Sequence, residues 1–342
     1  MSFGSGETME QSSGRSGALM ELFQHILEDI GALREFLHSE FSSSEPFVNE
    51  LLQHLSRFQG KQVRPACLFL SGRCFGEIET DHIKCAAVVE LIHTATLVHD
   101  DLLDQAAIRR RVETIHSRYG DRAAILLGDI IYARGFVIST EVEGAARLLA
   151  DCTRDICIGE MLQVGNAGNL LLSQEQYFEI IHRKTAILYG LSCRLGALLA
   201  GANPDQVAAM EKFGNQLGVA FQIVDDSLDV LGDPETVGKS LGTDLVNGKM
   251  TLPIILLRDG LDSDQRDSLL DLLGNHREPD PGPEFHREVV RRLEQFEIFE
   301  QVRKKAQDSI DSAIASLHEA APESQSRNHL EQLAHFVLER EL

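Results

Sequence analysis

Apolar residues recur at three- and four-residue steps along almost the whole chain. In the first such stretch, residues 19–37, Leu22, Ile26, Ile30 and Leu33 fall on one face of a helix. This spacing indicates amphipathic α-helices, whereas alternating runs of β-branched residues, which indicate strands, are scarce. The pattern predicts an all-α fold: one large helical bundle whose facing helices can hold a site in a central cavity.

Two of the predicted helices have clear ends. Asn203 and Pro204 suit the N-cap and the first helical position, and the helix can continue until the Gly-Asp-Pro sequence at 232–234 stops it. Thr80 similarly opens a helix that is expected to cover residues 81–104.

A break between helices at residues 232–248 has an unusual composition. It contains Lys239, Asp244 and Lys249 at its end together with four glycines. Such a segment suits a mobile flap over phosphate groups, although the composition alone also fits a plain surface loop. A proline-rich break at 278–283 is predicted to be a simple connection.

The first 17 residues are rich in glycine, serine and glutamate and lack an apolar stretch. They are predicted to form a disordered tail, residues 1–17, ahead of the helical domain at 18–342. They do not have the apolar centre of a signal peptide. No other apolar run reaches the roughly 20 residues that a membrane-spanning helix needs, so a soluble, cytoplasmic protein is expected.

The chain of 342 residues has a formal net charge of −21. This charge argues against electrostatic binding to nucleic acid or to an anionic membrane surface. An anionic substrate would have to be attracted by a metal ion and by locally placed cations. The six cysteines are scattered without a CxxC pair, so buried, reduced thiols are expected.

The sequence DDxxD occurs twice, each time inside an apolar run with helical spacing. Its aspartates are Asp100, Asp101 and Asp104 in the first patch and Asp225, Asp226 and Asp229 in the second. The first and last members of each patch share one helix face, where like charges repel. Crowded carboxylates must bind a proton or a cation, and Mg²⁺ is commonly held by one or two carboxylates with phosphate oxygens completing its shell. The two patches therefore predict a metal-bridged diphosphate site.

Two other interpretations of the patches are weaker. A single DDxxD in so acidic a chain fits a solvated helix end, but apolar residues on both sides of both patches argue against this. Neither patch has the alternating oxygen ligands or the central glycine of an EF-hand loop.

Basic residues complete the predicted site. Lys61 and Arg64 precede an apolar helix, and Arg109, Arg110 and Arg111 follow the first patch within seven residues. A guanidinium group binds two phosphate oxygens at a time. Several arginines beside Mg²⁺ would therefore hold a diphosphate in a defined pose.

The order of these motifs resembles the trans-isoprenyl diphosphate synthase, or polyprenyl synthetase, family. That family shows GKxxRP, HxATLxHDDxxD with paired arginines, GD, GExxQ, KT, FQxxDDxxD and GKxxGxDLxxGKxTLP. The corresponding segments here are 60–65, 93–104 with Arg109 and Arg110, 128–129, 159–163, 184–185, 221–229 and 238–253. Seven motifs in the same order make the resemblance specific. It implies the isoprenoid synthase fold and is greatest for long-chain, octaprenyl diphosphate synthase-like members.

The resemblance also implies a role for each residue. Mg²⁺, expected as three ions, would be held by Asp100, Asp104, Asp225 and Asp229, assisted by Asp101 and Asp226, while an allylic diphosphate ionises. Arg109, Lys184 and Lys239 would grip the leaving diphosphate, and Thr185 and Gln222 would direct oxygens toward the allylic cation. Isopentenyl diphosphate would be held by Lys61, Arg64, His93 and Arg110, and Lys249 is a further expected substrate contact. The double bond would attack the cation, and a proton would then pass to the released diphosphate.

Two positions depart from the family pattern. Gln62 replaces a common basic residue after Lys61, and Arg111 replaces the glycine that usually follows the paired arginines. Neither change removes an expected diphosphate contact, but either could change substrate affinity or loop shape.

Helix geometry predicts the length of the product. Ala95 and Thr96 lie one turn before Asp100, where a growing hydrocarbon tail would pass, and both are small. A turn rises about 5.4 Å, similar to an isoprene unit, so a channel without an aromatic floor at this level admits further additions. A product of hexaprenyl to octaprenyl length or longer is expected, with Phe136 a candidate deeper floor.

Alternative functions are open at this level. A farnesyl or geranylgeranyl diphosphate synthase is the nearest one. A class I terpene cyclase would not ordinarily need the second patch or the basic pair Lys61 and Arg64. A noncatalytic partner subunit would lack the aspartates that this chain retains. The resemblance further implies a homodimer, and two-fold dimers are the commonest oligomers.

Overall fold

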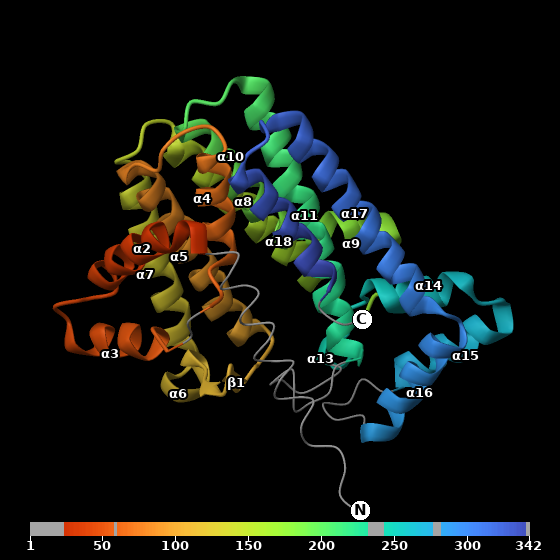
Figure 1. Ribbon diagram of the computed structural model, residues 1–342. Coiled ribbons are helices and arrows are strands. Elements are labelled where there is room, and N and C mark those ends of the chain that lie inside the picture. Colours follow the sequence, from red (N-terminus) through yellow and green to blue (C-terminus); the bar gives the residue numbers. More distant parts are fainter. Residues whose placement is uncertain (1–23, 58–59, 232–242, 276–281, 340–342) are drawn as a thin grey trace, which may run out of the picture.

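The computed structural model describes residues 24–57, 60–231, 243–275 and 282–339. These residues are almost entirely helical, which confirms the predicted all-α fold (Figure 1). Several predicted segments lie outside the described residues. They are the tail 1–17, the start of the first predicted helix, residues 232–242 of the predicted flap with Lys239, and residues 278–281 of the proline-rich break.

The elements follow one another in a simple order. They are the 3-10 turn η1 (Gln24–Ile26), α2 (Leu27–Glu40), α3 (Pro46–Leu55), α4 (Val63–Arg73), α5 (Thr80–Leu103), β1 (Ile108–Arg109), β2 (Val112–Glu113), α6 (Ile115–Tyr119), α7 (Asp121–Ser139), α8 (Ala145–Gly165), α9 (Gln174–Ile181), the π-helix η2 (His182–Ala186), α10 (Ile187–Leu199), α11 (Pro204–Leu231), α13 (Thr243–Val246), α14 (Leu252–Gly260), α15 (Ser263–Asn275), α16 (Gly282–Gln295), α17 (Ile298–Ala320) and α18 (Gln325–Leu338).

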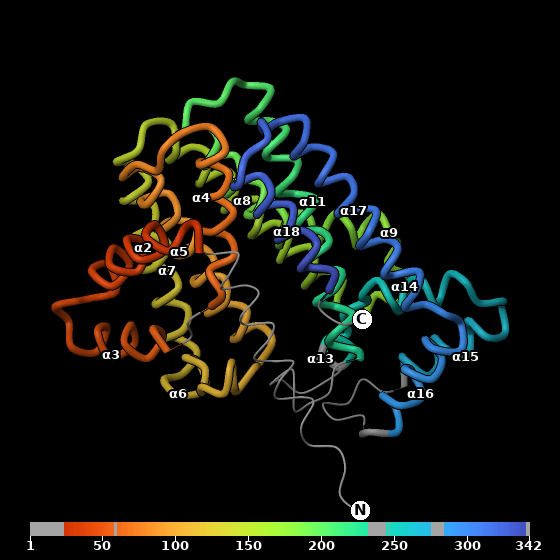
Figure 2. Tube along the Cα trace, in the orientation of Figure 1, coloured from red at the N-terminus to blue at the C-terminus, as the bar shows by residue number. Residues whose placement is uncertain are grey.

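The longest helices form the centre of the bundle. α11 packs between α10 and α17, while α5 packs along α7 and α10 packs on α4. Figure 2 shows that α2, α3 and α5–α7 lie on one side of the molecule and that α14–α16 lie on the other. One continuous cluster of buried apolar side chains connects these helices, and Phe69, Tyr189 and Phe213 are among its largest members.

The predicted start of α11 agrees with the structure, and its predicted stop at 232–234 lies outside the described residues. The side-chain oxygen of Asn203 accepts a hydrogen bond from the Gln206 N–H at 3.0 Å, and the helix starts at Pro204. Helix α5 differs by one residue. Its N-cap is Glu79 rather than Thr80, because the Glu79 N–H donates to His82 Nδ1 at 3.1 Å in a capping box.

A short hairpin follows α5 and was not predicted. Ile108 pairs with Glu113, and Arg109 pairs with Val112 in antiparallel register. Two-residue hairpin turns normally carry Asn or Gly, because their backbone angles are left-handed, and here both turn positions are arginines. This turn chemistry explains why no hairpin was predicted.

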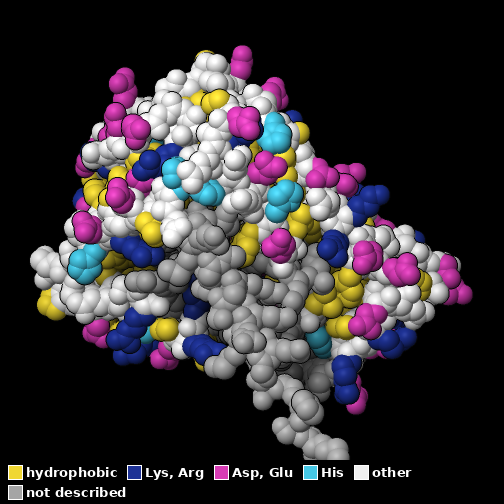
Figure 3. All heavy atoms as spheres, in the orientation of Figure 1, with side chains coloured by type: hydrophobic (Ala, Val, Ile, Leu, Met, Phe, Trp, Pro, Cys, Tyr) yellow, Lys and Arg dark blue, Asp and Glu magenta, His cyan; other side chains and the backbone are white. Residues whose placement is uncertain are grey.

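The six cysteines are free, as expected. Five are buried, but Cys157 on α8 is exposed, contrary to the expectation of uniformly buried thiols. In the part of the chain that the structure describes, no helix has the length and apolarity to cross a membrane. Figure 3 shows acidic side chains spread over the visible face, interspersed with fewer lysines and arginines.

Candidate active site

The two aspartate patches lie at the C-terminal ends of long helices. Asp104 is the C-cap residue of α5, and Asp225 and Asp229 lie in the last two turns of α11. The C-terminal end of a helix carries partial negative charge, so carboxylates there are unfavourable for the helix itself. Their placement therefore requires another cause, and a bound cation supplies one.

Ion pairs and hydrogen bonds join the two patches into one site. Lys249 Nζ lies 2.9 Å from Asp104 Oδ2 and 3.4 Å from Asp244 Oδ1. The Asp244 N–H in turn donates to Asp229 Oδ2 at 3.0 Å. The predicted meeting of the first patch, the second patch and the lysine at the end of the 232–248 segment is thus present in the structure.

A second lysine contacts the first patch at Asp100. Lys184 Nζ is 3.6 Å from Asp100 Oδ2 and 2.5 Å from Glu160 Oε2 of α8. Burial lowers the pKa of Lys184, but Asp100 and Glu160 outweigh this effect and raise it. Burial likewise lowers the pKa of Lys249, and Asp244 and Asp104 raise it. Both ammonium groups are charged and neutralise part of the acidic cluster.

The surroundings of Asp100 disfavour its negative charge. Its pKa is raised to about 6. Burial is the largest cause, the negative charges of Glu160 and Asp104 also raise the pKa, and the positive charge of Lys184 lowers it. A carboxylate in such surroundings is stabilised by a cation.

The carboxylates suit Mg²⁺ that takes only some of its ligands from the protein. Among the described residues, no three acidic, histidine or cysteine side chains already converge on one point. Mg²⁺ is typically bound by one or two carboxylates, with water and substrate phosphate oxygens as its other ligands. Asp100, Asp104, Asp225 and Asp229 are all partly exposed, so their oxygens remain accessible for this purpose.

The middle aspartates are arranged differently from their neighbours. Asp101 and Asp226 are only 5% and 6% exposed. Arg109 Nε donates to Asp101 Oδ1 at 2.7 Å, and Tyr177 and Gln222 both donate to Asp226. The pKa of Asp226 is raised to about 8. Burial is the largest cause and the charge of Asp244 adds to it, while the two hydrogen bonds lower the pKa.

A π-helix presents Lys184 and Thr185. Five residues, His182–Ala186, form this wide turn between α9 and α10, and such turns often occur at functional sites because they redirect side chains. Helix α8 passes very close to it at Gly159: a Cβ there would lie 2.6 Å from the Lys184 backbone N. Only glycine allows this approach, which brings Glu160 to Lys184.

The predicted isopentenyl diphosphate residues form a second, basic cluster. The Arg64 guanidinium lies 4.5 Å from the centre of the Tyr189 ring, and Arg110 packs against Gly60. Burial, followed by the charges of Arg64 and Arg110, holds the pKa of His93 well below its ordinary range. Arg64 Nε is buried without an acceptor among the described residues, as expected of a donor that binds an anion.

Lys61 begins this cluster and is exposed. Glu90, one turn before His93 on α5, is partly exposed and lies next to the arginines. Burial raises its pKa, and Arg64 and Arg110 lower it. Glu90 was not predicted as a site residue.

The residues predicted to set product length differ in their surroundings. Ala95 is fully buried, whereas Thr96 is partly exposed and its hydroxyl donates to the His93 carbonyl at 2.7 Å. Phe136 on α7 is 36% exposed and stacks on Tyr132 with ring centres 6.5 Å apart. The Tyr132 ring also contacts His99, the residue before Asp100, at 5.9 Å. An aromatic surface therefore extends along α7 from the first patch.

Sequence reasoning missed several residues of the site. Glu160 and Gln163 were visible in the GExxQ motif, and Asp244 was visible in the glycine-rich segment, but none had been assigned a role. Tyr177 and Glu90 gave no local signal, because only packing between distant helices brings them to the site.

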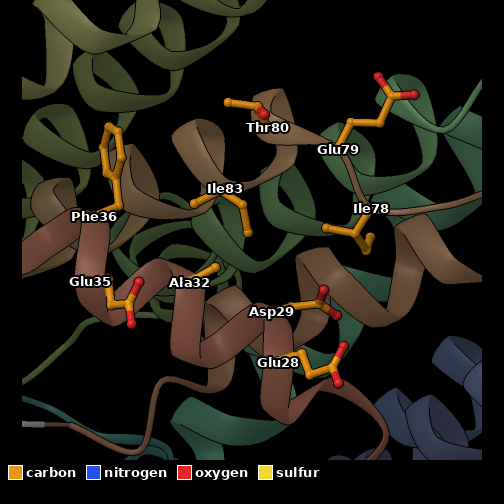
Figure 4. Close-up of a pocket in the computed structure, with 9 residues that line it drawn as sticks. All are labelled: Glu28, Asp29, Ala32, Glu35, Phe36, Ile78, Glu79, Thr80 and Ile83. Atoms are coloured by element: carbon orange, nitrogen blue, oxygen red, sulfur yellow. The ribbon is translucent and has the colours of Figure 1, made fainter.

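A surface hollow elsewhere is unrelated to this site. It measures about 510 Å³ and lies between α2 and the start of α5, and its lining includes Glu28, Glu35, Phe36, Glu79 and Ile83 (Figure 4). It is near Thr80, about 30 Å along α5 from Asp100. The hollow therefore belongs to the outer surface.

Comparison with known proteins decides the family. The sequence model of the polyprenyl synthetase family matches residues 45–283. This chain belongs to the polyprenyl synthetase family. It is accordingly an enzyme that transfers prenyl groups in isoprenoid synthesis, as the motifs predicted.

Similar proteins differ in the length of their products. The chain is 36% identical over 295 residues to a short chain isoprenyl diphosphate synthase from Methanothermobacter thermautotrophicus, covering 84% of this chain and 89% of that relative. It is 31% identical over 317 residues to octaprenyl diphosphate synthase from Escherichia coli, covering 92% and 96% respectively.

A solved structure confirms the fold. The polyprenyl synthase from Caulobacter crescentus, complexed with calcium and isoprenyl diphosphate, superposes with a TM-score of 0.87 at 32% identity. The match covers 94% of this chain and 97% of the other.

Proposed function

We propose that this enzyme joins isopentenyl diphosphate head-to-tail to an allylic diphosphate and makes a long trans-polyprenyl diphosphate of about C30–C40 or longer. The main support is the continuous series Asp104, Lys249, Asp244 and Asp229, which connects both aspartate patches. The acidic cluster would bind one diphosphate through Mg²⁺, and the neighbouring basic cluster of Arg64 and Arg110 would bind another directly. The site therefore suits two diphosphates rather than one.

The residues divide the reaction between them. Asp100, Asp104, Asp225 and Asp229 would hold Mg²⁺, three ions in all, which when bound neutralises the departing diphosphate. Arg109, Lys184, Lys239 and Lys249 would bind the same leaving group. Lys61, Arg64, His93 and Arg110 would hold isopentenyl diphosphate, with neutral His93 donating or accepting one hydrogen bond.

The chemistry of each addition requires no protein base. The allylic C–O bond breaks and its electron pair leaves with the diphosphate. The double bond of isopentenyl diphosphate then forms the new C–C bond, and the resulting cation loses a proton to the released diphosphate. Thr185 and Gln222 would stabilise the first cation through their oxygens.

Small residues one turn below Asp100 support the long product. Thr96 is partly exposed and offers little bulk against a growing tail. The alternative, a short farnesyl or geranylgeranyl product, is favoured by the aromatic surface of Tyr132 and Phe136 and by the similarity to the short-chain enzyme.

An exposed apolar stripe supports a homodimer. Leu126, Ile130 and Val137 of α7 and Ile158 and Met161 of α8 are each 38–72% exposed. At 100° per residue, the three α7 side chains lie opposite Gly128 and Tyr132, which face α5. Large exposed apolar patches commonly mark protein interfaces, and a second copy of the chain would cover this one.

Product analysis tests the proposed function. Purified protein would be incubated with Mg²⁺, labelled isopentenyl diphosphate and, separately, dimethylallyl, geranyl, farnesyl and geranylgeranyl diphosphates, and the hydrolysed products would be sized by chromatography. Long linear polyprenols are expected. A single short product would refute the long channel, and no elongation of any primer would refute the synthase activity.

A further inference from the structure

A buried series of hydrogen bonds connects α9, α11 and the π-helix behind the second patch. The Tyr177 hydroxyl donates to Asp226 Oδ2 at 2.6 Å, and Gln222 Nε2 donates to Asp226 Oδ1 at 2.7 Å. The Thr185 hydroxyl then donates to Gln222 Oε1, also at 2.7 Å. Tyr177 is only 3% exposed and lies at the far end of this series from Thr185.

This series fixes which way the Gln222 amide points. Gln222 Nε2 donates to Asp226 Oδ1, so the NH₂ end of the amide faces Asp226. The carbonyl oxygen must then point in the opposite direction, where it meets Thr185. Because the Thr185 proton is directed at Gln222, the lone pairs of the hydroxyl oxygen are available on its other side.

The orientation of the Asp226 carboxylate depends on Tyr177 in turn. A carboxylate held at one oxygen can rotate about its side-chain bonds, whereas one held at both oxygens cannot do so without breaking a bond. Tyr177 and Gln222 each hold one oxygen. Tyr177 therefore determines, through one intervening side chain, the direction of the Gln222 dipole.

We propose that Tyr177 is a positioning residue for the prenyl transfer: through Asp226 it aims the oxygens of Gln222 and Thr185 at the allylic cation. The proposal rests on the function proposed above, in which these oxygens face the cation. Dipoles that are already oriented stabilise developing charge without reorganising during the reaction. Tyr177 touches no reacting atom and acts only through its neighbours.

The first patch contains a matching arrangement. Its middle aspartate, Asp101, is buried like Asp226 and holds Arg109 through Nε at 2.7 Å. In each patch the outer aspartates are partly exposed, and the middle one positions a side chain that is expected to contact substrate. This parallel supports a positioning role for the middle residue.

Steady-state kinetics of Tyr177→Phe tests the proposal. The substitution retains the ring and removes only the hydroxyl. Loss of such an outer hydrogen bond typically costs about ten- to hundredfold in activity, so we expect kcat to fall by about that factor while KM for isopentenyl diphosphate is unchanged. Tyr119→Phe is the matched control. The Tyr119 hydroxyl, on α6, donates to Glu50 of α3 at 3.1 Å, and loss of this hydroxyl should leave kcat unchanged.

A double-mutant cycle separates positioning from a general effect on stability. If Tyr177 acts through Gln222, then Tyr177→Phe should have no further effect in a Gln222→Ala background. Independent, multiplicative losses of kcat would overturn the proposal, as would a wild-type kcat in Tyr177→Phe. An inactive wild-type enzyme would instead refute the proposed function itself.

A second variant applies if Tyr177→Phe does not fold. Asp226→Asn preserves the shape of the side chain but introduces a donor opposite Gln222, which allows the Gln222 amide to turn around. We expect the same selective fall in kcat with native helix content by circular dichroism. Wild-type kcat in this variant would contradict the proposal.

Discussion

Two arginines occupy the turn that follows the first aspartate patch. Arg110 and Arg111 have φ values of 51° and 65°, in the left-handed region. This conformation costs a residue with a Cβ about 1–2 kcal/mol. Arg111 replaces the glycine usual in the family, so the departure noted in the sequence has a structural cost.

Arg111→Gly should stabilise the protein. The gain from relieved strain exceeds the greater chain entropy of glycine, so we expect the free energy of unfolding to rise by about 0.5–1 kcal/mol. Urea denaturation measures the change. Arg118→Gly within α6 should have the opposite sign, because its backbone is helical; a loss of stability in both variants would disprove the strain.

Thr96 is the better position for testing the product channel. Thr96→Phe should shorten the product, since the new ring would project from the face of α5 that carries Asp100. Ala95 is fully buried, so a phenylalanine there would also disturb the core. Phe136→Ala, which removes the deeper aromatic group, should lengthen the product. Chromatography of the hydrolysed products would show both changes, and an unaltered distribution in both variants would refute this direction for the tail.

At the scale of elements, the contact between α8 and the π-helix is a close one that reaches the site. Gly159→Ala would place a Cβ 2.6 Å from a backbone nitrogen that cannot move alone. We expect a loss of about 1–3 kcal/mol in unfolding free energy and a large fall in kcat, because Lys184 would shift from Asp100.

Gly165→Ala is the control for that prediction. Gly165 lies on the same helix, and nothing is within 4 Å of a Cβ built there. The free energy of unfolding of Gly165→Ala should equal or exceed that of wild type, since alanine favours helix more than glycine does. Equal effects of the two substitutions in thermal unfolding and kinetics would show that the close approach is unimportant.

Local signals explain which elements could be predicted. Asn203 and Pro204 mark the start of α11 through short-range chemistry, and the structure retains both. The β1–β2 hairpin was missed because its turn residues, Arg110 and Arg111, are atypical. Predictions thus succeeded where the sequence follows local rules and failed where the backbone departs from them.

The site followed the same division. The aspartate patches could be predicted because crowded carboxylates require cations wherever they lie. Lys184 and Lys249 were expected, from the family motifs, to bind substrate, and their ion pairs with Asp100 and Asp104 were not predicted. The bond from Tyr177 to Asp226 spans 49 residues of sequence, and no local pattern indicates it. Only the packing of α9 beside α11 creates that contact.

For the whole molecule, the main expectation is that two copies of the chain associate through the exposed apolar stripe. Leu126→Lys, in the exposed stripe of α7 and α8, should convert a dimer to a monomer because it would bury a charge in an apolar interface. Leu198→Lys on α10 is the control, at 40% exposure outside the stripe. Light scattering coupled to gel filtration measures the mass; a dimer that survives Leu126→Lys would exclude this face as the interface.

The net charge of −21 also acts at this scale. It repels anionic substrates at long range, so the local cations and the metal must supply the attraction. Attraction of the two diphosphates would therefore exceed this repulsion only close to the aspartate patches, where Mg²⁺ would bind, and close to the arginines.

The most direct test is the release of inorganic diphosphate from geranyl and isopentenyl diphosphates, with and without Mg²⁺, by wild type, Asp225→Asn and Asp151→Asn. Asp151 is a surface residue that pairs with Arg147 and Arg154. We expect release that depends on Mg²⁺ in wild type and Asp151→Asn, and a fall of at least about a hundredfold in Asp225→Asn with unchanged helix content. Near-normal release by Asp225→Asn, or release without Mg²⁺, would contradict the account.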